Sequence, residues 1–332
     1  MRISRALLPL LLSATLLTPS AIATGHNAPS GVDVASWQGA IDWSAVNQSQ
    51  DFAFIKATEG IGYQNPQYTH DIQQARNNGL VVGAYHYARP GTDPVAQAAE
   101  FAAAYNAHPQ DLPPVMDLEQ TDGLGPAELQ AWTRTFLGET ERLTGRTPIV
   151  YTYRYFWQQD MGNTTEFKRY PLWLAAYQNE VPGQLPGGWD QMAFWQRADD
   201  GRVSGIHTPV DMNLFNGTPG QLAGFSGYGG VLAPGEKVAT GFDLGGSAKE
   251  LILALLAAAG AMGVMPADQA GALAQQLGGA AGLQGDVAGA LGGLVKDLGG
   301  NLPVGDLQAM AQGNYTIGDL LLLLNAAGHK AP

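Results

Sequence analysis

The sequence contains no cysteine, which excludes a disulfide scaffold, a thiolate nucleophile and a cysteine-based metal site. Basic side chains are also scarce, because 17 Lys and Arg face 29 Asp and Glu, for a net charge of −12 at pH 7. A nucleic-acid-binding protein needs a basic face, so we expect no nucleic-acid partner. Hydrophobic residues nevertheless make up 45% of the 332 residues, which is enough for a sizeable core and excludes a largely disordered chain.

Long apolar runs are also missing from the interior of the chain. The longest, residues 251–265, is shorter than the ~20 residues that a membrane-spanning helix needs, and glycines interrupt it. At the N-terminus, Arg2 and Arg5 precede a short apolar run, ALLPLLLSATLL, and small residues follow at positions 21 and 23. This order of basic, apolar and small residues predicts a secretory signal peptide over residues 1–23. We therefore expect a secreted protein, extracellular or associated with the cell wall.

The composition changes sharply near residue 220. All seven tryptophans lie before this point, whereas the rest of the chain holds four aromatic residues, Phe225, Tyr228, Phe242 and Tyr315. The stretch GFSGYGGVLAPGE has the composition of a linker. After the signal peptide we therefore predict a first domain, a linker and a C-terminal region, bounded as 24–220, 221–246 and 247–332.

The first domain alternates strand-like and helix-like segments. Thr92-Asp93-Pro94 and Gly125-Pro126 each open a helical stretch, because proline suits the first position of a helix. Repeated β-then-α order predicts an α/β fold, an irregular TIM-like βα barrel that is short of helices from Tyr153 onward. The eight candidate strands begin at Gly31, Asp51, Leu80, Pro114, Thr147, Pro171, Gln191 and Val210.

Two carboxylates end the strand PVMDLE. Asp117 and Glu119 are two residues apart, so their side chains leave the strand on the same face. In a βα barrel the active site lies at this end of the strands. Partial burial and like charge push the proton affinities of two such groups apart, which keeps one protonated as an acid and the other ionised. The pair therefore predicts general acid catalysis, with a solvated loop pair as the simpler alternative.

Other strand ends carry groups suited to a sugar substrate. Asp33 lies on the first strand and Asp211 on the last, and a closed barrel brings these two strands side by side. Aromatic rings can stack on the C–H faces of sugars while carboxylates and amides bind the hydroxyls. Any single ring alone favours ordinary core, but their concentration at strand ends favours a sugar site. The candidate substrate contacts are Tyr87, Tyr153, Trp173, Tyr177, Trp195 and Gln196.

Four ordered motifs, DVASWQG, FIKATEGIGYQNP, GAYHYARP and PVMDLE, together with the later LWLAAY, FWQ and VDMNLF, resemble glycoside hydrolase family 25. The likeness covers about residues 31–217 and identifies the first domain as a catalytic barrel of that family. It implies an N-acetylmuramidase that hydrolyses the β-1,4 bond between N-acetylmuramic acid and N-acetylglucosamine in peptidoglycan. It implies Glu119 as the general acid, Asp117 as the residue that stabilises or orients the reacting sugar, and Asp33 and Asp211 as further acids.

The residues leave the route of hydrolysis open. Two carboxyls on one strand do not fix their separation, which decides between retention and inversion. A 2-acetamido group on the sugar allows a third route, in which it attacks the anomeric carbon while Asp117 orients it, and we prefer this route. The histidines are scattered without a metal-binding motif, so we expect no metal and no cofactor. We expect His86 to be structural and Lys56 to pair with Glu59 near the mouth.

The C-terminal region, residues 247–332, is rich in Gly, Ala and Leu and predicts a small all-α fold. One helix should start near Ser247 and end before Pro266, two similar units (GALAQQLGG and GALGGLVKDLGG) follow, and NYTIGDLLLLLNAAG predicts a last helix. Such helices either pack only on one another or contact the cell envelope. We expect a monomer whose partner is peptidoglycan. The alternatives are an inactive wall-binding protein and a chitinase-like hydrolase.

Overall fold

The computed structural model describes residues 28–225, 229–238, 247–264, 294–298 and 301–329. The chain forms two compact units, residues 23–240 and residues 1–22 with 241–332. The predicted signal peptide and most of the two glycine-rich repeat units lie outside the described residues. We call the first unit the barrel unit and the described part of the second, from residue 247 onward, the helical unit.

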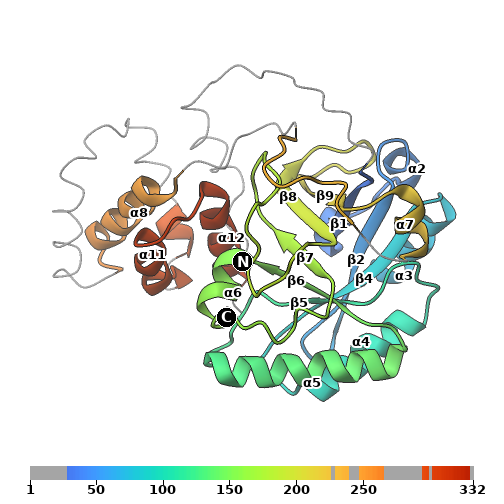
Figure 1. The fold of residues 1–332 in the computed structure, drawn as a ribbon, viewed down its shortest axis with the longest axis horizontal. Coiled ribbons are helices and arrows are strands. Elements are labelled where there is room, and N and C mark those ends of the chain that lie inside the picture. The colour runs from blue at the N-terminus through green and yellow to red at the C-terminus, as the bar shows by residue number, and fades with distance from the viewer. Residues whose placement is uncertain (1–27, 226–228, 239–246, 265–293, 299–300, 330–332) are drawn as a thin grey trace. The chain divides into compact units, whose positions relative to one another are not determined.

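Eight strands of a nine-stranded sheet close into a barrel in the first unit (Figure 1). The order is β1-β9-β8-β7-β6-β5-β4-β2, and β1 also pairs with β2, while the short β3 pairs with β2 outside the ring. Within the ring, neighbours are parallel except that β9 runs antiparallel to both β8 and β1, and outside it β3 runs antiparallel to β2. The predicted irregular α/β barrel is therefore confirmed. Its strands are β1 (Ser30–Val34), β2 (Phe52–Glu59), β3 (Tyr63–Gln64), β4 (Val81–Tyr87), β5 (Val115–Asp117), β6 (Ile149–Tyr153), β7 (Leu172–Ala175), β8 (Phe194–Gly201) and β9 (Val210–Phe215).

Helices cover the outside of the first strands. The Asp93 side chain caps α4 by accepting from the Ala96 backbone N–H at 2.7 Å, and Gly145 ends α5 in the left-handed conformation. The connections from β7 to β8 and from β8 to β9 are described throughout and contain no helix, so the expected irregularity is present. The helical segments of this unit are η1 (Ser36–Gln38), α2 (Trp43–Val46), α3 (Tyr68–Asn77), α4 (Pro94–Asn106), α5 (Pro126–Thr144), α6 (Arg154–Gln159) and α7 (Pro219–Gly224).

Aromatic rings fill the barrel below its mouth. The rings of Phe54 and Trp173 stack with centroids 4.4 Å apart, and Phe194 contacts Phe54 edge-on at 5.0 Å. A Cβ on Gly83 would lie 2.7 Å from the Phe54 ring, so this strand needs glycine where the ring crosses it. Because the interior is packed, a substrate can enter only at the open ends of the strands.

The barrel unit extends past the boundary that the composition indicated. The ring of Phe225 stacks on Phe194 with centroids 5.9 Å apart, and the backbone N–H of Leu232 donates to Asn216 Oδ1 at 2.9 Å. The backbone of Lys237 forms an isolated antiparallel β-bridge with that of Glu180. The sequence after residue 220 looked like a linker because it is rich in glycine, but these contacts make the described part of it, up to residue 238, a piece of the barrel unit.

The helical unit contains α8 (Lys249–Ala261), α11 (Val304–Ala311) and α12 (Ile317–Gly328), in agreement with the predicted all-α region. Thr316 caps α12, because its hydroxyl accepts from the Asp319 backbone at 3.2 Å while the Asp319 carboxylate accepts from the Thr316 backbone at 2.8 Å. No helix within the described ranges has the length and hydropathy that crossing a membrane requires.

Candidate active site

Four acidic residues meet at the end of the barrel where the parallel strands end and the antiparallel β9 begins. Asp33 of β1 is the direct partner of Asp211 in the antiparallel ladder with β9, so the two side chains leave the sheet on the same side. Asp117 ends β5, and Glu119 follows two residues later. Asp33 is among the charges that raise the pKa of both Asp117 and Glu119, because their like charges lie close together. The structure thus brings the four predicted acids together at one mouth.

Burial dominates the electrostatics of the central pair. It raises the pKa of Asp117 well above its usual value, and the neighbouring charge of Glu119 raises it further. Burial also raises the pKa of Glu119 to about 7, although the Tyr87 hydroxyl donates a hydrogen bond to that carboxylate and opposes the shift. Two interacting carboxyls titrate as a pair, so this pair retains a proton near neutral pH. A proton held there is what a general acid needs.

One carboxylate oxygen of Asp117, Oδ1, has no hydrogen-bond partner among the described residues. Asp117 as a whole is only 7% exposed. An unsatisfied buried oxygen is costly to keep in a folded protein. It is therefore an acceptor available to a donor on the substrate.

A hydrogen-bond network orients Asp33. Its Oδ2 accepts from Gln196 Nε2 at 2.9 Å and from Asn213 Nδ2 at 2.7 Å. The Gln196 Oε1 in turn accepts from the hydroxyls of Tyr151 at 2.9 Å and Tyr177 at 3.3 Å. These donors fix which end of the Gln196 amide faces Asp33, so the carboxylate is held in place before any substrate arrives.

Two cations flank the Tyr87 ring. Lys56 Nζ lies 4.6 Å and the Arg89 guanidinium carbon 5.0 Å from its centroid. Glu59 holds both, with Oε2 2.5 Å from Lys56 Nζ and Oε1 2.8 Å from Arg89 Nη2. Burial alone would raise the pKa of Glu59, but these two positive charges hold it below its usual value. Since both cations also lower the pKa of Glu119, the cluster tunes the candidate acid.

A β-bulge makes the predicted Lys56 and Glu59 pair geometrically possible. Residues three apart on a regular strand face opposite sides. The pairing of β2 with β4 shifts register between Lys56 and Thr58, and such an extra residue re-aims the side chains that follow it. Both charged side chains therefore turn to the same side of the sheet, and the expected ion pair is confirmed.

The predicted aromatic contacts lie at different depths. Tyr87 and Tyr177 are 5% and 4% exposed and belong to the hydrogen-bond networks of the mouth, as does Gln196. Tyr153 is 1% exposed and ends β6.

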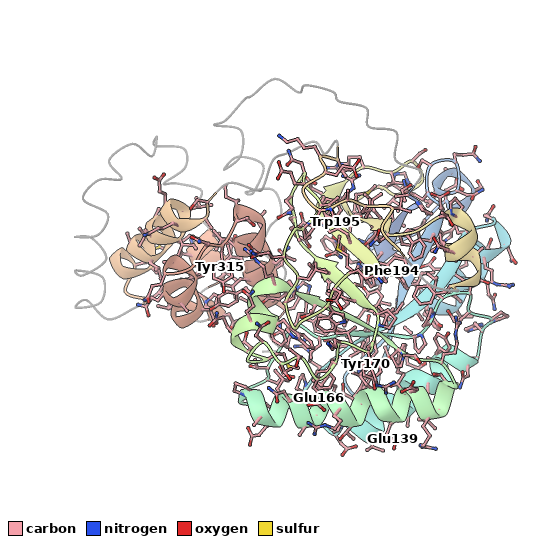
Figure 2. All side chains as sticks on the ribbon, viewed as in Figure 1. Glu139, Glu166, Tyr170, Phe194, Trp195 and Tyr315 are labelled. Carbon is pink, nitrogen blue, oxygen red and sulfur yellow. The ribbon has the colours of Figure 1, made fainter. Side chains whose placement is uncertain are left out.

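The two predicted tryptophans, Trp173 and Trp195, differ from the expectation, because both indoles are buried and hydrogen-bonded within the protein. The Trp173 indole donates to Asn213 Oδ1 at 2.8 Å in the filled interior. The indole of Trp195, labelled on β8 in Figure 2, is fully buried and donates to a backbone carbonyl at 2.8 Å.

His86 lies outside the acidic mouth. Thr58 Oγ1 lies 2.8 Å from its Nδ1 and Gln97 Oε1 2.8 Å from its Nε2, and its ring stacks on Phe136. Because Gln97 Oε1 can only accept, Nε2 carries the proton and Nδ1 accepts from Thr58. Burial lowers the pKa of His86 to about 4. It is a neutral structural residue, as expected. No group of three or more His, Asp or Glu side chains within the described segments is arranged to hold a metal ion.

Sequence reasoning missed several members of the site. Tyr151 and Asn213 each lie two positions from a predicted residue on the same strand face, Tyr153 and Asp211, so the strand period could have indicated them. Gln120, which donates to the Tyr87 hydroxyl at 3.2 Å, follows the acidic pair without a comparable signal.

Comparisons with known proteins agree on one family. The sequence model described as glycosyl hydrolases family 25 matches residues 32–206. Lysozyme M1 of Streptomyces globisporus is 34% identical over 58% of this chain and 69% of its own length, and N,O-diacetylmuramidase of Chalaropsis sp is 34% identical over 56% and 95%. The crystal structure of a lysozyme from Streptomyces coelicolor matches with a TM-score of 0.57 and 33% identity, over 60% of this chain and 98% of that one.

Proposed function

Since the chain belongs to glycosyl hydrolase family 25 and is a lysozyme that hydrolyses peptidoglycan, we propose which residues perform the reaction and where it takes place. Glu119 is the general acid, and Asp117 orients the reacting sugar. The bond cleaved is the β-1,4 bond between N-acetylmuramic acid and N-acetylglucosamine. The observation that carries this proposal is the pair of neighbouring carboxyls at and just after the end of β5, in which burial raises the pKa of Glu119 to about 7.

Glu119 is suited to protonate the leaving sugar. Cleavage transfers a proton to the glycosidic oxygen as its bond to the anomeric carbon breaks. A carboxyl with a pKa near the working pH is both protonated in a large fraction of molecules and a useful donor. The Tyr87 hydroxyl fixes the orientation of the group, and Glu119 keeps part of its surface accessible to a ligand.

Asp117 suits a route in which the substrate supplies its own nucleophile. The acetamido oxygen forms a bond to the anomeric carbon, while Asp117 Oδ1, which lacks a protein partner in the described residues, accepts the acetamido N–H. Water then attacks the anomeric carbon, gives its proton to the Glu119 carboxylate and reopens the acetamido group. The β configuration is retained in this route, and Asp33 and Asp211 add negative charge beside the oxocarbenium-like centre.

The protein acts outside the cell that makes it. The basic, apolar and small residues over positions 1–23 support export. Residues from 24 to about 240 form the catalytic barrel in this proposal, which moves the end of the domain from residue 220 because of the contacts of Phe225 and Leu232. The region from 247 to 332 holds the enzyme at the cell envelope, and the protein works as a monomer.

Digestion of purified peptidoglycan followed by mass analysis of the fragments tests the activity. We expect new reducing ends on N-acetylmuramic acid. Reducing ends on N-acetylglucosamine, or cut peptide stems, would contradict the proposed bond, and hydrolysis of chitin at a similar rate would favour the chitinase-like alternative. Proton NMR of the first product separates retention from inversion, because attack through the acetamido group, like attack by an enzyme carboxylate, releases the β anomer and single displacement releases the α anomer.

A further inference from the structure

Three large apolar side chains are exposed on two short segments that follow β1 and β2. Trp37 is 43% exposed, Ile61 48% and Tyr63 39%. Trp37 belongs to η1, directly after β1, whereas the other two belong to the turn and short strand after β2. Ser36 Oγ and the Tyr63 hydroxyl lie 3.2 Å apart and join the segments. Clustered exposed apolar side chains mark binding surfaces more often than isolated ones do. We call these three residues the rim platform.

Hydrogen bonds fix both segments. The Gln38 side chain accepts from the backbone N–H of Ala35 at 2.8 Å and is 5% exposed. In the other segment the Gly60 N–H donates to a carbonyl of β4 at 3.1 Å, and the Gly62 N–H donates to Glu100 at 2.7 Å. The exposure of the platform is therefore a feature of ordered backbone, and a ligand would meet a preformed surface, with little ordering left to be done on binding.

The platform continues the acidic mouth. Lys56 Nζ lies 5.6 Å from the Tyr63 ring centroid and 4.6 Å from that of Tyr87, and the Tyr87 hydroxyl is hydrogen-bonded to Glu119. On the other segment, Trp37 follows Asp33 by four residues. Both segments of the rim platform therefore lie next to residues of the candidate active site. A glycan strand bound at the site could extend along the platform.

We propose that the rim platform binds a further sugar of the same glycan strand, outside the two sugars that flank the cleaved bond. This inference rests on the proposed function. An exposed indole offers its face to the C–H groups of a pyranose ring, and the Ser36 and Tyr63 hydroxyls, 3.2 Å apart, are groups that can bond the sugar hydroxyls. Glu100 places a carboxylate next to the same turn, which disfavours an acidic stem peptide as the occupant. The platform thus selects for strand length.

Trp37→Ala tests the proposal on two substrates, long soluble glycan strands and a disaccharide of N-acetylmuramic acid and N-acetylglucosamine that fills only the two sites beside the cleaved bond. We expect the KM for long strands to rise about 10-fold with kcat unchanged, a loss of about 1.4 kcal/mol of binding. The KM for the disaccharide should change by less than about two-fold. Trp37→Phe keeps a ring and should restore most of the affinity. Val95→Ala removes a side chain that is 46% exposed on α4 and serves as the matched control.

The other outcomes overturn the proposal. An equal loss on both substrates would place Trp37 in the cleavage site itself, and no loss on either would leave the platform without a ligand. If the loss vanished once stem peptides had been removed from the strands, the occupant would be the peptide. Should Trp37→Ala fail to fold, Ile61→Ala must give the same length-dependent loss. If the wild type cleaved neither substrate, the proposed function would fail, and calorimetric binding of long strands to wild type and Trp37→Ala would still decide the inference.

Discussion

The two units of the chain bury carboxylates for different reasons. In the barrel unit, Asp117 is only 7% exposed, lies beside other acids and has an Oδ1 without a hydrogen-bond partner among the described residues. In the helical unit, Asp319 is buried as well, but its carboxylate accepts from the Thr316 hydroxyl at 2.9 Å as a helix cap. Burying a carboxylate costs free energy unless hydrogen bonds compensate it. Asp117 therefore indicates chemistry, whereas Asp319 indicates only where a helix begins.

Removing one carboxyl from each unit should give the largest difference in activity between the two units. Glu119→Gln keeps the shape of the side chain but removes the transferable proton, so kcat/KM on peptidoglycan should fall about 10²–10⁴-fold while binding survives. Glu250→Gln makes the same chemical change in the first turn of α8 and should leave kcat/KM unchanged. Turnover assays with binding of intact strands provide the measurement. Near wild-type lysis by Glu119→Gln would mean that another group is the acid.

Core truncations should show whether the two units fold separately. Leu322 of α12 is 2% exposed and Phe54 of β2 is fully buried. Leu322→Ala should lower the free energy of unfolding of the helical unit by about 2–5 kcal/mol and leave hydrolysis of soluble fragments intact. Phe54→Ala should cost the barrel about 3–5 kcal/mol and reduce that hydrolysis. Calorimetry and activity assays on both variants measure this, and a loss of fragment hydrolysis in Leu322→Ala would show that the units depend on each other.

Deleting the helical unit should affect insoluble substrate only. A chain that ends after residue 240 retains every candidate catalytic group and the packing of Phe225 on the barrel. It should hydrolyse soluble fragments at the full-length rate. On whole walls it should be slower, by about 10-fold, because tethering raises the concentration of enzyme at its polymer. Faster hydrolysis of soluble fragments would instead indicate that the helical unit inhibits the site.

The smallest expected effect is a shift in the pH profile of kcat/KM. The acid must begin protonated, so kcat/KM should fall as the pH rises through the pKa of Glu119, near 7. Lys56 lowers that pKa. Lys56→Met should therefore raise it and move the alkaline limb of the pH profile to higher pH, while Lys56→Arg keeps the charge and should restore the original limb. Lys249→Met removes a lysine from α8 and should not move it. A shift to lower pH in Lys56→Met would contradict the tuning role of Lys56.

The parts of the site that could be predicted are those that the strand period and the closure of the barrel fix. The two-residue spacing of Asp117 and Glu119 predicted that their charges would interact, as they do, and Asp33 and Asp211 meet because the barrel closes. The period cannot tell how deep a ring lies. Trp173 therefore looked like a rim residue although it fills the interior against Phe54.

Other features depend on contacts that the sequence does not display. The glycine-rich stretch after residue 220 packs on the barrel through Phe225 and Leu232, which its composition concealed. The hydrogen bond that joins Ser36 to Tyr63 links segments far apart in sequence. The helical unit was predictable as helices because its apolar residues and caps have helical spacing, but apolar spacing carries no information about a partner.

The most direct test of the central claim, that Glu119 donates the proton to the leaving sugar, uses a substrate that needs none. A 2,4-dinitrophenyl glycoside of N-acetylmuramic acid has a leaving group that departs unprotonated. In single-turnover release of dinitrophenolate, Glu119→Gln should match the wild type within a few-fold, although it loses about 10²–10⁴-fold on peptidoglycan. An equally large loss on both substrates would show that Glu119 does not act as the general acid.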